Sequence, residues 1–281
     1  MGIDKTYDYC VSKAIPDGSN LYYATIFDSV KNKTIIITLH AFLYELSEII
    51  HECSDPGIAR IKLKWWQEEI ERLSNNEARH PVTQQMQECI IIDHKLIIIF
   101  NSIIECFNQF IFVEQPDSIE SILSLYKSTS GEISYQCGMQ LNQTKTDPLN
   151  IMRELAALIH FIGCLQQPRT YINETRCIIP VSTIEHANLL ELGVDTANKH
   201  MRQKEVFSPL FLDLKIRLDK TYQALNRKEN HNLQHVLILN RLAYKTCDEI
   251  LRDGCNLLDT NVSITPVRKL WIACWTHFTL K

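Results

Sequence analysis

The sequence is poor in the residues that make tight turns: its 281 residues include only eight glycines and nine prolines. A protein built from many short strands needs more turn residues than this. With 45% hydrophobic and 22% charged residues, the composition is that of a globular protein with a large core. Disordered, collagen-like and mini-protein classes are therefore excluded, and helices are predicted.

The sequence also lacks a strong excess of either charge, because 29 Lys and Arg stand against 33 Asp and Glu, for a formal net charge of −4. Nucleic-acid-binding proteins usually carry a basic patch or a basic overall balance. We therefore predict no nucleic-acid partner.

The ten cysteines contain no CxxC pair, which argues against a zinc ribbon or a redox motif. Most of them lie in apolar stretches, where a free cysteine packs as a small hydrophobe, as in a reduced cytoplasmic protein. The N-terminus has no apolar signal-peptide core. The longest charge-free interval, residues 155–168, is shorter than the ~18 residues of a membrane span. We therefore predict a cytoplasmic protein whose helices do not cross a bilayer.

Apolar residues recur at helical spacing along most of the chain. The run from Leu96 to Phe100 is β-branched enough to suggest a strand, but the length of the apolar pattern that follows it favours a buried helix. No repeat, low-complexity tract or Gly/Ser-rich linker divides the chain, so residues 1–281 are predicted to form a single all-α domain. The predicted helices cover residues 33–53, 56–75, 81–92, 94–113, 117–128, 130–142, 149–166, 200–227, 233–253 and 264–279.

None of the widespread catalytic signatures occurs, whether P-loop, GxGxxG, GxSxG or HExxH. Longer strings are more informative, and they span nearly the whole chain. They are YCVSKAIPDGSNLYY at 9–23, HAFLYELSEIIHECSDPGIARIKLKWWQEEI at 40–70, HPVTQQM at 80–86, RCIIP at 176–180 and VSITPVRKLWIA at 262–273. Together they resemble the squalene/phytoene synthase family, especially its presqualene diphosphate synthases of hopanoid biosynthesis.

The resemblance implies an all-α, single-domain isoprenoid synthase bundle around a central apolar cavity. It also implies an activity, the condensation of two farnesyl or geranylgeranyl diphosphates. In the family, two aspartate-rich motifs on facing helices hold Mg²⁺ against the diphosphates. Carboxylate oxygens suit this task because hard Mg²⁺ prefers them and because the metal then offsets the charge of the leaving group.

The first motif departs from the family pattern. The resemblance places acids at the positions of Ser47, Glu48, His51 and Glu52, and only Glu48 and Glu52 keep carboxylates. Glu45, Glu48 and Glu52 share one side of a helix, so a weak metal site at Glu48 and Glu52 is one interpretation. We favour the other, an acidic face that pairs with cations of the next helix. The cations in question are Arg60, Lys62 and Lys64.

The second motif has lost all of its carboxylates. Glutamine carbonyls bring no charge to offset Mg²⁺, Pro168 is expected to end the helix, and Arg169 adds a cation. We favour the interpretation that the site is catalytically inactive and that its residues have changed without gaining a new role. The alternative is a site that binds an anion without a metal. The positions of this motif are Gly163, Gln166, Gln167, Thr170 and Tyr171.

Four other positions keep the family pattern and are predicted by the resemblance to contact substrate: Tyr22, Tyr23, Gly131 and Arg176. Each also has a purely structural interpretation, because tyrosines fill cores, an Arg caps carbonyls after a helix, and a Gly permits close helix packing. These residues therefore support common ancestry with the family more than they support a retained catalytic activity.

Two aromatic groups are predicted to pack. Trp65 and Trp66 point about 100° apart on a helix, so one can lie in the core and the other at a surface or cavity edge. For the second group we expect core packing, with contact to a membrane surface as the alternative. It is the C-terminal stripe of Trp271, Trp275 and Phe278 beside Arg268 and Lys269.

The lost carboxylates favour a catalytically impaired or non-catalytic family member that acts by binding a lipid or a protein. The alternative is an active, Mg²⁺-dependent prenyltransferase of the presqualene diphosphate, squalene or phytoene synthase type, and Mg²⁺ is a cofactor only in that case. A third hypothesis is a chain that supports an intact partner enzyme. Expected partners are an isoprenoid diphosphate or another lipid, a protein, or the surface of a membrane.

Overall fold

The computed structural model describes residues 5–111, 116, 118–166, 196–226 and 228–279, and every regular element in these residues is helical. The all-α class predicted from the sequence is confirmed. The α-helices are α1 (Lys5–Ala14), α2 (Asn20–Ala24), α3 (Val30–Glu52), α4 (Pro56–Ser74), α5 (Pro81–Cys89), α6 (His94–Phe110), α7 (Ile119–Tyr126), α8 (Glu132–Gln140), α9 (Thr146–Leu165), α12 (Thr196–Leu225), α13 (Gln234–Arg252) and α14 (Pro266–Thr279). Two short elements, the π-helix η1 (Lys127–Gly131) and the 3₁₀ helix η2 (Lys228–Leu233), complete the set.

Two of the helix starts lie where the sequence provides a capping carboxylate. The Asp55 side chain accepts a hydrogen bond from the backbone N–H of Ile58 at 3.1 Å, with Pro56 in the first turn. Asp93 accepts from the backbone N–H of Leu96 at 2.7 Å. Such caps satisfy N–H groups that the helix itself leaves unpaired. The helix predicted over 94–113 is therefore present as α6, despite its β-branched run.

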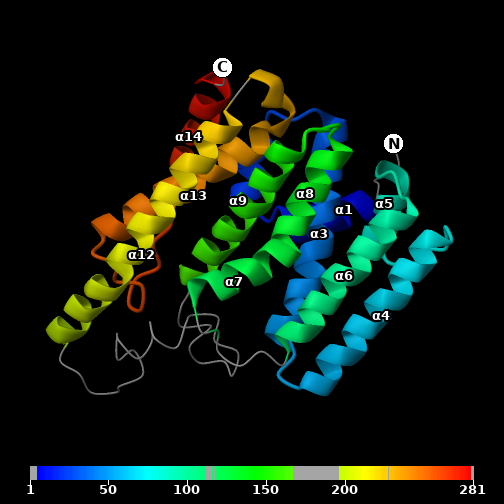
Figure 1. Ribbon diagram of the computed structural model, residues 1–281, viewed down its shortest axis with the longest axis horizontal. Helices are drawn as coiled ribbons and strands as arrows, with labels where there is room; N and C mark the ends of the chain where they lie inside the picture. Colours follow the sequence, from blue (N-terminus) through cyan, green and yellow to red (C-terminus); the bar gives the residue numbers. More distant parts are fainter. Residues whose placement is uncertain (1–4, 112–115, 117, 167–195, 227, 280–281) are drawn as a thin grey trace.

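Helix α3 runs through the middle of the bundle and contacts α1, α4, α5, α6 and α8 (Figure 1). Helix α9 contacts α7, α8, α12 and α13, and α13 also contacts α2 and α14. In Figure 1, α4 and α6 lie on one flank and α12 to α14 on the other. The helices between these flanks, α3, α8 and α9, are the ones that line the central cavity together with α2 and α13.

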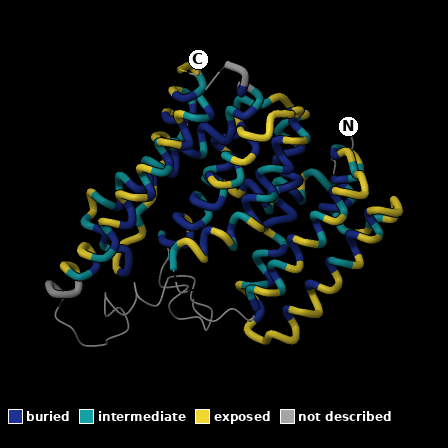
Figure 2. Tube along the Cα trace, viewed as in Figure 1, coloured by how far each residue is buried: buried dark blue, intermediate teal, exposed yellow. Residues whose placement is uncertain are grey.

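The core consists of buried clusters on both sides of the bundle (Figure 2). Around α3 the aromatic rings of Phe42, Trp66 and Phe100 meet edge to face, with the Phe42 centroid 5.4 Å from Trp66 and 5.1 Å from Phe100. Trp66 is buried, whereas Trp65 is 41% exposed. This is the division predicted for two neighbouring residues of one helix.

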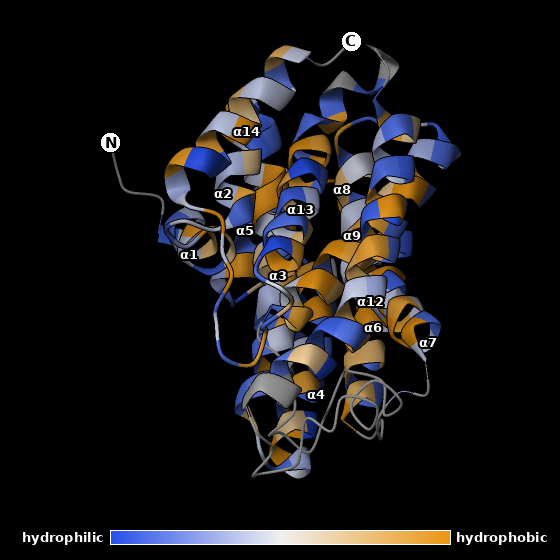
Figure 3. Ribbon diagram, turned by 90° about the vertical axis from the view of Figure 1, so that its left-hand side faces the viewer, coloured by the Kyte–Doolittle hydropathy of each residue, from blue (hydrophilic) through white to orange (hydrophobic). Residues whose placement is uncertain are grey.

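The C-terminal aromatic stripe lies at the surface, so the prediction that it packs in the core is wrong. Trp271, Trp275 and Phe278 are 62%, 60% and 78% exposed, and the two tryptophan rings stack at 5.5 Å. Helix α14 lies beside α2 and α13, and no other helix of the described residues covers its outer side (Figure 3). Its buried face is formed by Ile272 and Ala273, which leaves the tryptophans on the uncovered face.

Helices α3 and α9 are long and apolar enough to cross a membrane by length and composition, and 56% of each apolar window is buried inside the bundle. Core helices of soluble proteins have the same properties, so these two helices are weak evidence for a span. The expected location of the protein stays a prediction.

Candidate functional site

A cavity of about 400 Å³ lies between α2, α3, α8, α9 and α13. Natural ligand pockets usually measure about 300–1,000 Å³, so the space suits one small ligand. The accessible surface of the lining is mostly apolar, although many of its residues are polar, and its aliphatic members include Leu43, Leu155, Ile159, Ile162, Val236 and Leu239.

The first-motif positions on α3 reach this cavity. Ser47, Glu48 and His51 belong to its lining, whereas Glu52 is exposed and does not. The Ser47 hydroxyl donates to the carbonyl of Leu43 at 2.9 Å. Of the two carboxylates that the sequence retains in this motif, only Glu48 therefore faces the cavity.

Glu48 is paired with a cation from the first helix rather than from the following one. Lys13 of α1 lies 2.5 Å from the Glu48 carboxylate and 3.4 Å from that of Glu45. Although burial lowers it, the hydrogen bond to Glu48 and the charge of Glu45 raise the pKa of Lys13 above its ordinary value. The Tyr9 hydroxyl donates to Glu45 at 2.6 Å, and burial together with this bond raises the pKa of Tyr9 to about 12. The predicted acidic face thus exists, but its cation is Lys13.

The second-motif positions that the structure describes face the same cavity from α9 and its C-terminal end. Gly163 and Gln166 are lining residues, and the Gln166 amide donates to the carbonyl of Val262 at 2.9 Å. The structure thus brings the described positions of both motifs together on one cavity. The remaining residues assigned to this wall, and the predicted substrate residue Arg176, lie outside the described residues. These are Gln167, Pro168, Arg169, Thr170 and Tyr171.

The motif residues on the cavity do not fit the pair of Mg²⁺ sites that the resemblance implies. Glu48 is the only carboxylate among the described motif positions on the lining, and it is neutralised by Lys13. The facing wall offers Gly163 and an amide that is already bonded. In the described part of the chain no group of three His, Cys, Asp or Glu side chains is arranged to hold a metal ion. Mg²⁺ prefers several carboxylate and water oxygens, which this donor set does not provide.

Three of the retained family positions are described, and none of them lines the cavity. Tyr23 is buried between α2 and α13, and its ring meets the half-exposed Tyr22 edge to face at 5.2 Å. Gly131 lies against α9, where a Cβ would come within 2.6 Å of the carbonyl oxygen of Arg153. The structure therefore gives Gly131 a packing role, and the substrate contacts of these residues stay a prediction.

The most distinctive residues of the lining were not predicted from the sequence. They are three histidines, His40 on α3, His160 on α9 and His235 on α13, which join the predicted motif position His51 on the lining. Burial lowers the pKa of His40, although its bond to the carbonyl of Ile36 opposes this. Burial and the nearby His51 lower the pKa of His160 to about 4, and burial and His40 lower that of His235 to about 3. At neutral pH, His160 and His235 are therefore uncharged.

Tyr44 belongs to the same wall of the cavity. Its side chain is 40% exposed, yet burial raises the pKa of its hydroxyl. Both observations fit a ring whose accessible surface faces an enclosed space. Ser130, in the π-helix η1, and Ser134 also line the cavity, and π-helical turns are often found at functional sites.

A sequence signal for this wall exists on α3. His40, Tyr44, Ser47 and His51 follow one another along this helix at steps of four, three and four residues, which places them on one face. Such a polar line within a buried helix indicates a cavity or a partner. His160 and His235 have no comparable local pattern, because their meeting with α3 is set by the tertiary fold.

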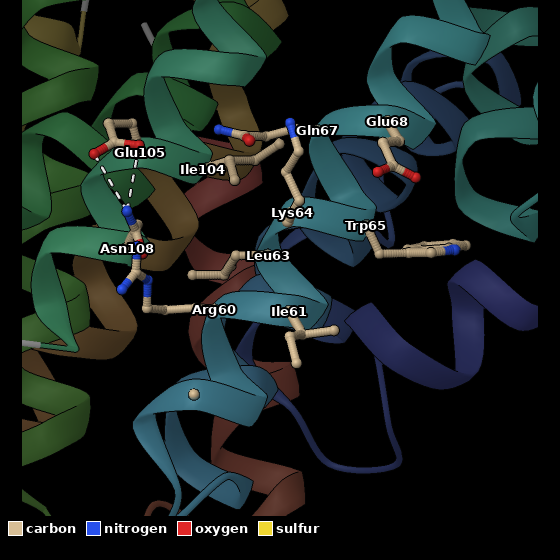
Figure 4. A pocket seen from close by; sticks show the side chains of 11 residues that line it. Arg60, Ile61, Leu63, Lys64, Trp65, Gln67, Glu68, Ile104, Glu105 and Asn108 are labelled. Carbon is tan, nitrogen blue, oxygen red and sulfur yellow. Dashed lines mark hydrogen bonds between the residues drawn. The ribbon is translucent and has the colours of Figure 1, made fainter.

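Two larger hollows, of about 620 and 610 Å³, lie along the outer helix α4. Figure 4 shows the first, a groove whose labelled side chains come from α4 and α6. Glu105 and Asn108 interact across one turn of α6 at 3.4 Å, while Arg60 and Lys64 extend from α4. These charged surface grooves contain none of the motif positions, so the central cavity is the candidate site.

Helices that surround one cavity, with the motif positions of α3 and α9 on its lining, have the architecture of the isoprenoid synthase fold. The solved structures agree. The structure of squalene synthase HpnC from Alicyclobacillus acidocaldarius matches with a TM-score of 0.69 and 12% identity, over 90% of this chain and 95% of that chain. A dehydrosqualene synthase in complex with ligand matches with a TM-score of 0.79 and 11% identity, over 98% of this chain and 96% of that chain.

The family follows from the sequence. The family model of squalene/phytoene synthase matches residues 17–268, which is most of the chain. This protein therefore belongs to the squalene/phytoene synthase family, as the resemblance of its sequence strings predicted. A comparison with curated proteins gives no match.

Proposed function

We propose that this protein is a non-catalytic member of the squalene/phytoene synthase family that binds a lipid in its central cavity. The observation that carries the proposal is the make-up of the two facing walls. One presents Glu48, held by Lys13, and the other presents Gly163 and Gln166. Prenyl diphosphate ionisation needs metal-bridged charge on both walls, and several kcal/mol of transition-state stabilisation depend on it.

The cavity itself supports binding rather than a collapsed site. Its volume of about 400 Å³ is not filled by side chains, and most of its accessible surface is apolar. An apolar space of this size loses contacts and free energy when empty, so a lipid tail is a favourable occupant.

The catalytic test is a product assay by mass spectrometry. Purified protein is incubated with farnesyl or geranylgeranyl diphosphate and Mg²⁺ or Mn²⁺, beside an intact family enzyme. We expect no presqualene diphosphate, squalene or phytoene while the control enzyme is active. A product that disappears in a Glu48→Ala, Glu52→Ala variant would show turnover and overturn the proposal.

The binding test uses organic extraction of the purified protein, followed by mass spectrometry. Ala156 lines the cavity, so Ala156→Phe fills part of it. We expect a lipid that co-purifies with the wild type and is depleted in a folded Ala156→Phe protein. Equal lipid recovery from both proteins would place the lipid elsewhere and contradict the proposal.

Contact with a membrane surface is a second candidate, and the exposed stripe on α14 favours it. Trp271 and Trp275 form a stacked pair at the surface beside the exposed Phe278. Tryptophans of this kind anchor amphipathic helices at the lipid interface. Sedimentation with anionic vesicles tests it: wild-type protein is expected to co-sediment, and Trp271→Ser, Trp275→Ser to stay in solution. Equal sedimentation of both would exclude this contact.

A further inference from the structure

The chemistry of the cavity lining indicates which class of lipid it accepts. Among the described residues that line the cavity there is no lysine or arginine, and the single carboxylate, Glu48, is paired with Lys13. A diphosphate group needs metal ions or several cations to offset its charge. The described lining offers neither, so it is not built for a diphosphate.

The polar residues form a line along α3 with a mouth and a buried end. His40 and His51 are eleven residues apart, which corresponds to about 16 Å along a helix. His51 is exposed and lies beside the half-exposed Glu48, so this end is the mouth. At the other end lie His40 and His235, two lining residues close enough for their charges to interact, and the His235 side chain is 1% exposed.

The buried end carries hydrogen-bonding groups that are not satisfied within the protein. The Nδ1 atom of His235 is buried and has no hydrogen-bond partner among the described residues. The Oδ1 atom of Asn20, a second lining residue, is in the same situation. Unpaired buried polar atoms are rare and call for a ligand or an ordered water molecule.

The hydrogen bonds of His40 define what the missing partner must be. Its Nδ1 atom lies 2.8 Å from the carbonyl oxygen of Ile36, and because a carbonyl only accepts, this nitrogen donates. The Nε2 atom of the neutral ring is therefore an acceptor. Neutral His235 brings one donor and one acceptor of its own. An uncharged hydroxyl or carbonyl group can bond to such a pair, whereas an anion finds no cation among the described lining residues.

We propose that the cavity binds a neutral, single-chain lipid whose hydroxyl or carbonyl group hydrogen-bonds to His40 and His235 at the buried end, while its chain follows the aliphatic walls toward His51. This inference rests on the proposed function, because it names the kind of lipid bound at the same site. A single chain suits the cavity volume of about 400 Å³, which is in the lower part of the usual range.

Three probes with the same fifteen-carbon tail test the inference on the wild-type protein: farnesol, farnesyl diphosphate and the hydrocarbon farnesene. Binding is measured by equilibrium dialysis with tritium-labelled probes, with and without Mg²⁺. We expect farnesol to bind at least tenfold more tightly than either of the others, because each satisfied hydrogen bond in a dry site is worth about one order of magnitude in affinity.

The substitution His235→Leu tests the role of the buried end. It keeps the volume and removes an unpaired polar atom, so the fold should be retained. We expect farnesol affinity to fall at least tenfold and farnesene affinity to stay unchanged. His235→Gln, which restores hydrogen bonding, should recover part of the loss. His94→Leu, at an exposed position on α6, is the matched control and should bind as the wild type does.

The outcomes separate the inference from the proposed function. Tighter binding of farnesyl diphosphate, or equal binding of farnesol and farnesene, would overturn the inference and keep lipid binding. Binding of none of the three probes, with water alone in the cavity, would overturn both. The wild-type probe series needs no substitution, so it decides the question even where a variant fails to fold.

Discussion

The neutral, buried His235 predicts how the stability of this protein depends on pH. Burial and the neighbouring His40 lower its pKa from 6.5 to about 3 in the folded protein. In the unfolded chain His235 therefore becomes protonated near pH 6.5, whereas in the folded protein it becomes protonated only near pH 3. The stability that His235 provides is complete above pH 6.5 and is lost progressively as the pH falls toward 3.

The magnitude follows from the pH interval. At pH 5.0 the solution is 1.5 pH units below the ordinary histidine pKa of 6.5, at which the unfolded chain takes up the proton, and each unit corresponds to about 1.36 kcal/mol. His235 alone should thus lower the free energy of unfolding by about 2 kcal/mol over this interval. In His235→Leu this contribution is absent. Between pH 7.5 and 5.0 the free energy of unfolding of the variant should therefore fall by about 2 kcal/mol less than that of the wild type.

The assay is urea denaturation followed by circular dichroism at both pH values and constant ionic strength. The comparison with a variant is essential because other groups also titrate. His160, with a pKa lowered to about 4, adds to the loss in both proteins, and Asp28, with a pKa raised to about 6 by burial, opposes it in both. His94→Leu should behave as the wild type. An equal loss in wild type and His235→Leu would refute the neutral, buried state of His235.

Four further predictions follow from the same contacts. Gly131→Ala should lower the free energy of unfolding by about 1–3 kcal/mol in urea titrations, because its Cβ meets the backbone of Arg153. Gly163→Ala is the matched control and should raise it by about 0.5–1 kcal/mol, because its Cβ enters open space within a helix; the reverse order would contradict both. Asp28→Asn should stabilise the protein by about 1–2 kcal/mol at pH 7.5, by about half as much at pH 5.0 and by little near pH 3.5, because the cost of the charged carboxyl falls below the raised pKa of about 6 and vanishes only below the ordinary pKa of 3.8; an equal effect at pH 7.5 and pH 3.5 would rule this out. Lys13→Gln should cost about 1 kcal/mol or less, because the ion pair is partly exposed, and a double-mutant cycle with Glu48→Gln measures the coupling. Millimolar Mg²⁺ should leave the melting temperature unchanged, and an increase would reveal a metal site on the folded protein.

Most helices could be predicted because their apolar residues repeat every three to four positions and their first residues carry caps. Helices α1 and α2 were missed, since α1 has only two buried residues, Cys10 and Ala14, and α2 is a single five-residue turn. The periodic pattern of apolar residues arises from the side of a helix that packs against the core. A short or mostly exposed helix has few such residues and is therefore hard to predict. That residues 1–281 form one domain stays a prediction.

The candidate site was only half predictable. The resemblance identified Ser47, Glu48 and His51, and these residues do line the cavity. The histidines of α9 and α13 were not predicted, because their approach to α3 depends on how distant helices pack. The pairing of Glu48 with Lys13 was missed for the same reason: the next helix in the sequence was expected to supply the cation, and α1 supplies it instead.

Lys13 offsets one of the two carboxylates, Glu45 and Glu48, that lie near the entrance of the cavity, and this lysine lies outside the cavity walls. A change of Lys13 to an acid would set three carboxylates, with Glu45 and Glu48, around the same opening. The strength of the negative potential met by an approaching lipid is thus controlled from α1, and one substitution that leaves every lining residue in place can increase it.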